Sequence, residues 1–474
     1  MSSSRHSDPL GNTGRVSPAD LIRSGLCIGC GACVARAQEN DVHMDFDPFG
    51  QWKPRAGSGW MRDRTADFSR ICPFSPSSKN EDVLAEELFP NAVKTDPQLG
   101  RLEATFVGHV AEGTFRASGS SGGMVTWVAT ELLRNGLVDA VAHVVERAGA
   151  ALADGPLFYY TLSRDPQALQ TGAKSRYYPV EMSGVLDEIR KTPGRYAVVG
   201  VPCFIKALRL LSSADPILKE RIAFTLGLVC GHMKSARMTE SFSWQMGQRI
   251  QDVERIDYRS KSPDRPASWY RASLGLRNGE LRARDWWNLV DGDWGAGFFQ
   301  NSACNYCDDV VAETADISFG DAWQEPYSSD GRGTNVVIVR SRALLELIGA
   351  GMESGRICLS PVDEAFVVST QAAGFRQRRE GLAFRMSLPR FGIRPGKRVA
   401  AVRHGLGARR KMIYGMRLAI SFWSHRVFWL AREMHWPGLY LGWARLMLSC
   451  YHALAYSRGP MGRLLDRFCP DRKL

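Results

Sequence analysis

Four cysteines near the N-terminus have the spacing of ligands to an iron–sulfur cluster. The segment CIGCGAC supplies Cys27, Cys30 and Cys33 as C-x2-C-x2-C, and Cys72 stands directly before a proline. Two-residue spacers let three thiolates surround one face of a cubane, and a remote Cys-Pro supplies the fourth ligand in ferredoxins that carry one cluster. The alternative is a structural zinc site, although zinc knuckles favour two C-x2-C pairs. We predict a [4Fe-4S] cluster at these cysteines.

Four further cysteines lie far apart in the sequence but close to predicted strands. Cys203 follows the strand YAVVGVP, Cys230 ends the strand IAFTLGLVC, and the pair Cys304 and Cys307 precedes the strand ADISFGDAW. The carboxyl ends of parallel strands line a common crevice in which cofactors bind. Three segments can therefore bring four thiolates together. Spacing alone leaves two alternatives open, because buried cysteines are commonly core residues and a C-x2-C pair also suits zinc.

The elements that must position these cysteines divide the chain into four parts. Residues 1–20 are polar and rich in Gly and Ser, which predicts a disordered N-terminus. Residues 21–95 form a small loop-rich unit with little hydrophobic periodicity, and such a unit usually needs a metal to hold it. Strands and helices alternate over residues 96–395, which predicts an α/β fold with α+β elements and a mostly parallel sheet. Residues 396–474 read as a basic, aromatic, helical tail.

Composition and charge restrict the function further. The chain has 474 residues, of which 44% are hydrophobic and 23% charged, as in globular proteins of two or three domains. Eleven cysteines without a signal sequence argue against a disulfide framework and predict a cytoplasmic protein. Residues 397–474 hold 15 basic and three acidic residues, whereas the remainder holds 46 of each. A neutral body argues against nucleic acid as a partner.

The motifs together resemble a known family. Four segments that follow CIGCGAC are similar, in their order, to the beta subunits of coenzyme F-420 hydrogenase/dehydrogenase. They are GVPCFIKALR, GLVCGH, CNYCDDVVAETADISFGDAW and GTNVVIVR. That family also includes 7-hydroxymethyl chlorophyll a reductase. The resemblance covers roughly residues 20–345. It implies an iron–sulfur flavoprotein with FAD and one or two [4Fe-4S] clusters, in which a ferredoxin-like domain precedes a flavin domain. Cys203, Cys230, Cys304 and Cys307 would bind the cluster nearest the flavin, and the N-terminal four would bind a second.

Several polar segments are candidates for flavin binding. ASGSSGGM leads into a helix, where exposed N–H groups suit a phosphate, and TGAKSRYYP combines a cation, a hydroxyl and aromatic rings. The alternatives are a flexible connector for the first segment and surface charge for the second. Asp316, Gly320 and Asp321 flank the strand ADISFGDAW, and Asn335 follows further on. The alternative for the aspartates is a structural one, because an Asp at a strand end is often only a cap. The candidates are Ser121, Gly122, Gly123, Lys174, Ser175, Asp316, Gly320, Asp321 and Asn335.

No nucleophilic triad, P-loop or paired-carboxylate arrangement is evident, so hydride chemistry would belong to the flavin. His232 is the one weak candidate for a catalytic group. It lies two residues after Cys230, where it would tune the cluster bound by Cys230 or donate a proton. A capping or core histidine is the commoner role.

The tail combines four tryptophans with arginines between residues 412 and 456. Arg445 near the middle of its most apolar stretch disfavours a spanning helix. We expect contact with the membrane surface or with an acidic protein instead.

These observations predict an electron-transfer enzyme. A ferredoxin-like donor or partner subunit would supply electrons through the two clusters to FAD for reduction, or oxidation, of a small organic acceptor. Two other functions remain open: a non-catalytic electron-transfer subunit whose partner holds the substrate site, and a zinc-stabilised interaction protein.

Overall fold

The structure is a computed structural model that describes residues 14–468 except 38 and 40. Residues 1–13, for which we predict disorder, lie outside the described residues. The predicted boundary at residue 20 is wrong, because α1 (Pro18–Arg23) begins before it. The Ser17 side chain accepts a hydrogen bond from the Asp20 backbone, and the Asp20 side chain accepts one from the Ser17 backbone, so a capping box fixes the start of this helix.

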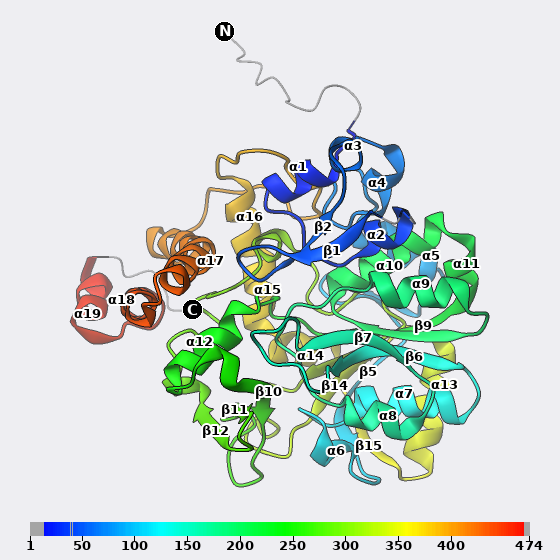
Figure 1. The fold of residues 1–474 in the computed structure, drawn as a ribbon. Coiled ribbons are helices and arrows are strands. Elements are labelled where there is room, and N and C mark those ends of the chain that lie inside the picture. The colour runs from blue at the N-terminus through cyan, green and yellow to red at the C-terminus, as the bar shows by residue number, and fades with distance from the viewer. Residues whose placement is uncertain (1–13, 38, 40, 469–474) are drawn as a thin grey trace.

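An eight-stranded sheet forms the centre of the molecule, in the order β15-β5-β14-β13-β9-β8-β6-β7 (Figure 1). Its strands are β5 (Ala104–Val110), β6 (Ala140–Glu146), β7 (Phe158–Ser163), β8 (Tyr196–Gly200), β9 (Ile222–Leu228), β13 (Ile317–Asp321), β14 (Asn335–Val339) and β15 (Ile357–Pro361). The expected α/β class and the strands expected from the sequence are confirmed.

The sheet is mixed, which corrects the prediction of a mostly parallel one. β6, β8, β9 and β13 run parallel at its centre, whereas β7, β14, β5 and β15 pair antiparallel. The physical reason is the connections: β6–β7 and β13–β14 are joined by loops without a crossover helix, and such a connection returns the chain in the opposite direction. The parallel centre still brings the carboxyl ends of β8, β9 and β13 to one edge.

Helices cover both faces of the sheet. α7 (Met124–Arg134) and α13 (Arg342–Glu353) pack on one face through Trp127 and Ile348, and α9 (Ser183–Lys191) and α10 (Pro202–Ala214) pack on the other. Alternation along β8 explains this, since Val198 faces α10 while Ala197 faces α7. The remaining elements of this region are β3 (Lys94–Asp96), β4 (Gly100–Leu102), α6 (Phe115–Ser118), α8 (Pro166–Thr171), α11 (Pro216–Arg221), α14 (Glu364–Thr370), α15 (Ala372–Arg378) and α16 (Glu380–Met386).

The N-terminal unit, blue in Figure 1, packs beside α9 and α10. Leu26, Ile28, Phe68 and Phe74 share one apolar core with residues of the sheet, so the unit is not separate from it. Its elements are α1, α2 (Ala32–Ala37), β1 (His43–Phe46), β2 (Trp52–Arg55), α3 (Ser58–Arg62), α4 (Ala66–Ile71) and α5 (Glu81–Leu88).

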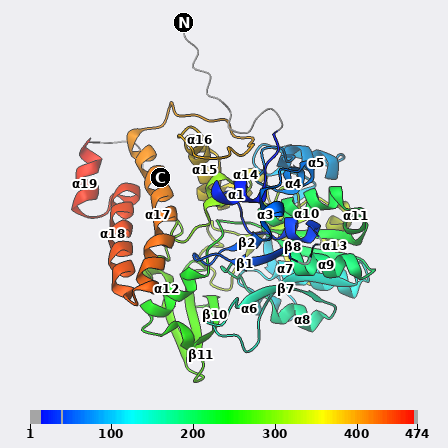
Figure 2. The same cartoon turned by 45° about the horizontal axis from the view of Figure 1, so that its top comes forward.

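A second apolar core joins the C-terminal helices to an antiparallel sheet, β10-β11-β12. Figure 2 shows the long helices α17 and α18 side by side, as their contacts also require. The elements are α12 (Arg237–Gln245), η2 (Ile250–Asp252), β10 (Val253–Ser260), β11 (Arg271–Leu276), β12 (Leu281–Asp285), η3 (Trp286–Asn288), η4 (Ser302–Tyr306), α17 (Ala408–Glu433), α18 (Pro437–Tyr456) and α19 (Gly459–Phe468). The predicted helical tail is thus a packed part of the body.

Candidate functional site

The first cysteine set surrounds a small apolar space inside the N-terminal unit. Cys27, Cys30, Cys33 and Cys72 all line it. The backbone turns sharply between Cys27 and Cys33. Gly29 has φ +80° and Gly31 has φ +83°, a region that residues with a Cβ rarely adopt. Glycine at these two positions therefore lets three cysteines face one point.

Burial and mutual proximity disfavour the charged forms of these thiols. Burial raises the pKa of Cys72 to about 12, and it also raises the pKa of Cys33, to which the Cys30, Cys27 and Cys72 sulfurs add. Thiols so placed stay protonated at neutral pH on their own. A metal centre that takes them as thiolates offsets this, because metal binding releases the protons.

The second set assembles at the carboxyl edge of the parallel strands. Cys203 lies in the first turn of α10 just after β8, and Cys230 lies two residues beyond β9. Cys304 lies in η4, and Cys307 is the residue that ends it. Burial raises the pKa of the Cys203 thiol, and the Cys307, Cys304 and Cys230 sulfurs raise it further, so these four side chains are neighbours. The structure therefore brings together the two cysteines that the sequence placed at strand ends and the C-x2-C pair that it placed before a strand.

The two sets lie next to each other. Cys30, Cys304 and Cys307 belong to one continuous apolar core, against which Cys33, Cys72 and Cys203 also pack. The Cys30 sulfur is close enough to contribute to the raised pKa of Cys203. Among the described residues, no three His, Cys, Asp or Glu side chains are arranged to hold a single metal ion. A cubane does not require that, since each thiolate binds a different iron.

A cavity of about 300 Å³ opens at the same edge of the sheet, and Cys230 forms part of its wall. This volume lies at the lower end of the usual range of ligand sites, roughly 300–1,000 Å³. Its walls come from the ends of β8, β9 and β13, the start of β14, the loop before α7, and residues 172–178. The two polar segments predicted from the sequence to bind flavin, ASGSSGGM and TGAKSRYYP, thus both line this cavity.

One end of the cavity combines a helix N-terminus with cationic side chains. Gly123 precedes α7 at φ +86°, and a Cβ there would lie 2.6 Å from the backbone carbon of Phe115. Asn335 Oδ1 accepts a hydrogen bond from the Met124 N–H at 3.2 Å and so fixes this helix start. Lys174 Nζ lies 3.1 Å from Asp257. Peptide N–H groups, a helix N-terminus and a cation suit the phosphates of a dinucleotide.

The other end of the cavity is aromatic and buried. Trp294 stacks against Trp286 and contacts Tyr177 edge-on with ring centroids 4.7 Å apart. Lys234 Nζ lies 4.9 Å from the Trp294 ring and donates to the Phe298 carbonyl at 2.6 Å, and burial lowers its pKa to about 7. His232 Nε2 is buried and has no hydrogen-bond partner among the described residues. A planar heterocycle with polar edges fits these surroundings and would satisfy that nitrogen.

Two family models match adjoining segments of the chain. Both describe the beta subunit of coenzyme F420 hydrogenase/dehydrogenase: the model of its N-terminal part matches residues 105–187, and the model of its C-terminal part matches residues 194–365. The chain belongs to this family. The resemblance drawn from the sequence motifs is thereby confirmed, and an oxidoreductase function is supported in broad terms.

Comparison with solved structures gives a match to the F420-reducing [NiFe] hydrogenase complex from Methanosarcina barkeri, studied by xenon derivatization. The identity is 17%, the TM-score is 0.48, and the match covers 64% of this chain and 99% of the other. No curated protein matches the chain. Among the described residues, no helix has both the length and the apolar character needed to cross a membrane.

Most of the predicted flavin contacts line the cavity, and two do not. Gly122 is packed beneath it, where a Cβ would meet Asn335 Oδ1 and the Gly108 carbonyl at 2.8 Å. Asp316 lies at the opposite end of β13, where it accepts hydrogen bonds from Arg209 at 2.8 Å and from the Thr225 backbone at 2.7 Å. Asp316 therefore does not line this cavity, because the residue before a strand lies at the opposite edge of the sheet from the residues after it. Those that line the cavity are Ser121, Gly123, Lys174, Ser175, Gly320, Asp321 and Asn335, with His232.

Sequence reasoning missed Lys234, Trp294 and Arg259, which all line the cavity. Arg259 is buried and pairs with Asp321 through bonds of 2.9 and 3.2 Å. The Lys in GLVCGHMK, four residues after Cys230, was an available signal. Trp294 and Arg259 come from the antiparallel region, and nothing local indicates that it folds back over the sheet.

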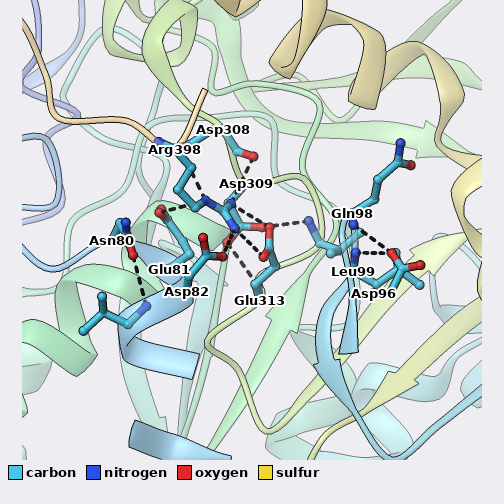
Figure 3. A network of polar contacts seen from close by, with 12 residues as sticks. Asn80, Glu81, Asp82, Asp96, Gln98, Leu99, Asp308, Asp309, Glu313 and Arg398 are labelled. Atoms are coloured by element: carbon cyan, nitrogen blue, oxygen red, sulfur yellow. Dashed lines mark hydrogen bonds and ion pairs between the residues drawn. The ribbon is translucent and has the colours of Figure 1, made fainter. Parts of the chain in front are cut away.

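Charged side chains around Arg398 connect Asp308, which follows Cys307, to the N-terminal unit and the tail (Figure 3). Arg398 forms two bonds with Glu313, of 2.7 and 2.8 Å, and lies 2.7 Å from Asp82 of α5. Lys397 Nζ lies 2.9 Å from Asp308, the residue after Cys307. Burial raises the pKa of Glu313, and Arg398 opposes this. These contacts tie three distant segments together beside the cysteines.

Helix α17 touches the surroundings of both cysteine sets. Ser421 Oγ accepts a hydrogen bond from Asn305, which lies between Cys304 and Cys307. On the first unit, His425 lies 3.3 Å from Gln51. Gln51 in turn accepts from Lys53, which donates to the Cys27 carbonyl at 2.7 Å.

Proposed function

We propose that this protein is an iron–sulfur flavoprotein oxidoreductase with two [4Fe-4S] clusters and FAD. Cys27, Cys30, Cys33 and Cys72 would bind one cluster, Cys203, Cys230, Cys304 and Cys307 the other, and the cavity would hold FAD. These groups supply single-electron exchange with a donor and two-electron reduction, or oxidation, of a small organic acceptor.

The observation that carries the proposal is the order of the three sites. The first cysteine set adjoins the second in one core, and Cys230 of the second set lines the cavity. Electron transfer needs redox centres close together, and this order would place each centre beside the next.

The chain's own residues have definable roles in this scheme. Gly123 and Ser121 would let the backbone approach a phosphate, with Lys174 as its counter-charge. Tyr177 and Trp294 would bound the ring system, and the partner-free Nε2 of His232 would face a polar edge of flavin or acceptor. Arg259 would hold Asp321 in place at the cavity wall.

The donor would be a ferredoxin-like protein or a redox partner subunit. An acidic partner is supported by the charge of the tail, because residues 397–474 hold 15 basic and three acidic residues. The exposed aromatic side chains of α17 also suit contact with a membrane surface, which is the alternative for this region.

The test is the composition of anaerobically purified full-length protein. We expect a brown protein with about eight irons, about eight sulfides and about one FAD per chain, the sum of two cubanes and one flavin. Cys30→Ala and Cys304→Ala should each remove about half of the iron, whereas Cys358→Ala, at an exposed cysteine outside both sets, should remove none.

Other outcomes separate the alternatives. Eight irons without flavin would favour a non-catalytic electron-transfer subunit, and that function would also require a copurifying partner that holds the acceptor site. A colourless protein that contains zinc would refute the redox function. Four irons that only one of the two alanine variants removes would restrict the proposal to a single cluster.

A further inference from the structure

Three buried arginines surround the second cysteine set, and among the described residues none of them has a carboxylate as a hydrogen-bond partner, although the charge of Asp293 acts on Arg417. Arg378, Arg385 and Arg417 are 5%, 4% and 7% exposed. In the part of the chain that the structure describes, their hydrogen-bond acceptors are backbone carbonyls, one amide, one imidazole and a cysteine sulfur, and no carboxylate. Two other buried arginines, Arg259 and Arg398, do have carboxylate partners, whereas the buried Arg340 is held by carbonyls and a hydroxyl. Burying a cation without an anion is unfavourable, so these three need an explanation.

Each arginine approaches the set from a different helix. Arg378 of α15 donates to the Gly231 carbonyl, next to Cys230, at 2.8 Å, and it also hydrogen-bonds Cys307. Arg385 of α16 donates to the Asn305 carbonyl, between Cys304 and Cys307, at 2.8 Å.

Arg417 of α17 reaches Gln300 Oε1 at 3.1 Å, His232 Nδ1 at 3.5 Å and the Trp294 carbonyl at 3.2 Å. It therefore spans the space between the cysteines and the aromatic end of the cavity. Two donors of this group remain unused, since Arg378 Nε and Arg385 Nη1 have no partner within the described residues.

The first cysteine set has fewer such cations. Lys206, whose charge acts on Cys72, pairs with Glu81 at 3.2 Å and is thereby neutralised. Lys53 donates to the Cys27 carbonyl and to Gln51, which leaves one buried cation there without a carboxylate. Among the described residues, three buried cations without a hydrogen-bonded carboxylate thus lie beside the second set and one lies beside the first. The buried Asp309, which acts on Cys230, offsets part of this positive charge at the second set.

We propose that Arg378, Arg385 and Arg417 form a cationic cage that raises the reduction potential of the second cluster above that of the first. The inference rests on the proposed function. A cubane with four thiolates is an anion and gains one negative charge when it takes one electron, without any proton. Three fixed positive charges stabilise the reduced form more than the oxidised form, and net charge and hydrogen bonds to sulfur are known determinants of cluster potential. Electrons delivered to the first cluster would then move toward the cavity.

The cage comes from a part of the chain that the family models do not reach. The C-terminal match ends at residue 365, whereas the three arginines lie on the helices that follow it. These helices would therefore set the direction of electron flow rather than serve only as a cover.

The experiment is a redox titration of the full-length, anaerobically purified protein, followed by electron paramagnetic resonance. The two midpoint potentials are assigned with Cys30→Ala, which removes the first cluster, and Cys304→Ala, which removes the second. We expect the second cluster to have the higher potential in the unaltered protein. Arg378→Gln and Arg417→Gln should each lower it and leave the first unchanged, and Arg378→Lys, which keeps the charge, should restore most of the shift. Arg342→Gln, a surface arginine with a 68% exposed side chain, should shift neither.

Three results would overturn the cage. The first is a second cluster with the lower potential in the unaltered protein, a measurement that needs no arginine variant to fold. The second is an equal shift of both clusters in Arg378→Gln, and the third is no shift in either glutamine variant. By contrast, protein that binds no iron under any anaerobic condition would refute the proposed function itself, so the two failures are distinguishable.

Discussion

The glycine before α7 shows how one residue prepares a binding site. Gly123 has φ +86°, and any side chain there would also collide with the backbone of Phe115 at 2.6 Å. Two separate effects therefore require glycine at this position: backbone conformation and the close approach of two chain segments.

Gly123→Ala should consequently lower both stability and flavin content. Gly136→Ala is the matched control, because Gly136 also has a positive φ (+64°) but has open space where a Cβ would lie. We expect about 1 kcal/mol of destabilisation at Gly136 from backbone strain alone. Gly123→Ala should lose more than about 2 kcal/mol, with reduced FAD per chain, because overpacking adds to the strain. Equal effects of the two variants on unfolding and on FAD content would argue against a tight loop at this site.

His143 predicts the pH dependence of folding. It lines the cavity, lies 2.7 Å from Ser163 Oγ, and burial lowers its pKa from 6.5 to about 4. The unfolded chain therefore takes up the proton first as the pH falls. The stability from neutral His143 is fully present above about pH 6.5 and is lost as the pH falls toward 4, by up to about 3 kcal/mol.

Denaturant unfolding at several pH values measures this contribution. The unfolding free energy of the unaltered protein should fall more steeply between pH 6.5 and 4 than that of His143→Gln. His43→Gln, at an exposed histidine, should behave like the unaltered protein. Identical slopes for the unaltered protein and His143→Gln would show that the buried ring does not titrate as described.

At the scale of elements, local sequence patterns predicted most strands and helices but not how the strands pair in the sheet. β8 and β9 are apolar runs followed by Cys203 and Cys230, so the edge that gathers the cysteines followed from the parallel arrangement of strands. Asp316 was misplaced because both ends of β13 carry an Asp and only the three-dimensional direction of the strand distinguishes them. Arg378, Arg385 and Arg417 gave no local signal, since most of their acceptors lie in distant segments of the chain.

The segment between α16 and α17 is fixed to the N-terminal unit by Arg398. Its guanidinium is buried against Glu313 and also pairs with the exposed Asp82, so Arg398→Gln leaves the buried Glu313 carboxylate without this cation. We expect a loss of roughly 3–5 kcal/mol in the free energy of unfolding. Arg249→Gln, which breaks the exposed pair with Asp252, should change it far less, because solvent screens that pair.

Urea unfolding of the two proteins under anaerobic conditions gives the comparison. A loss at Arg398 as small as that at Arg249 would mean that the network contributes little to holding the three segments together.

At the scale of the whole molecule, an exposed aromatic surface on α17 is the candidate docking site for an electron donor. We define the α17 patch as Phe422, Trp423, Arg426 and Trp429; its aromatic side chains are 45%, 52% and 41% exposed in chain order. Arg426 lies over the ring of Phe49 at 5.2 Å, so the patch continues onto the unit that holds the first cysteine set. Aromatic side chains together with arginine are typical of the centre of protein interfaces, and the surrounding tail is strongly basic. An acidic redox protein is the partner that this surface and its position favour.

Trp423→Ser with Arg426→Gln should therefore weaken delivery of electrons by an acidic ferredoxin without affecting reduction by a small chemical reductant. We expect KM for reduced ferredoxin to rise at least about tenfold, as the loss of two central interface side chains implies. Trp287→Ser, at a 70% exposed tryptophan on the antiparallel sheet, should leave it unchanged. High salt should reduce the difference between the unaltered and doubly substituted proteins, because charge attraction between exposed groups is screened. Unchanged ferredoxin kinetics together with loss of binding to vesicles of anionic lipid would assign the patch to a membrane surface instead.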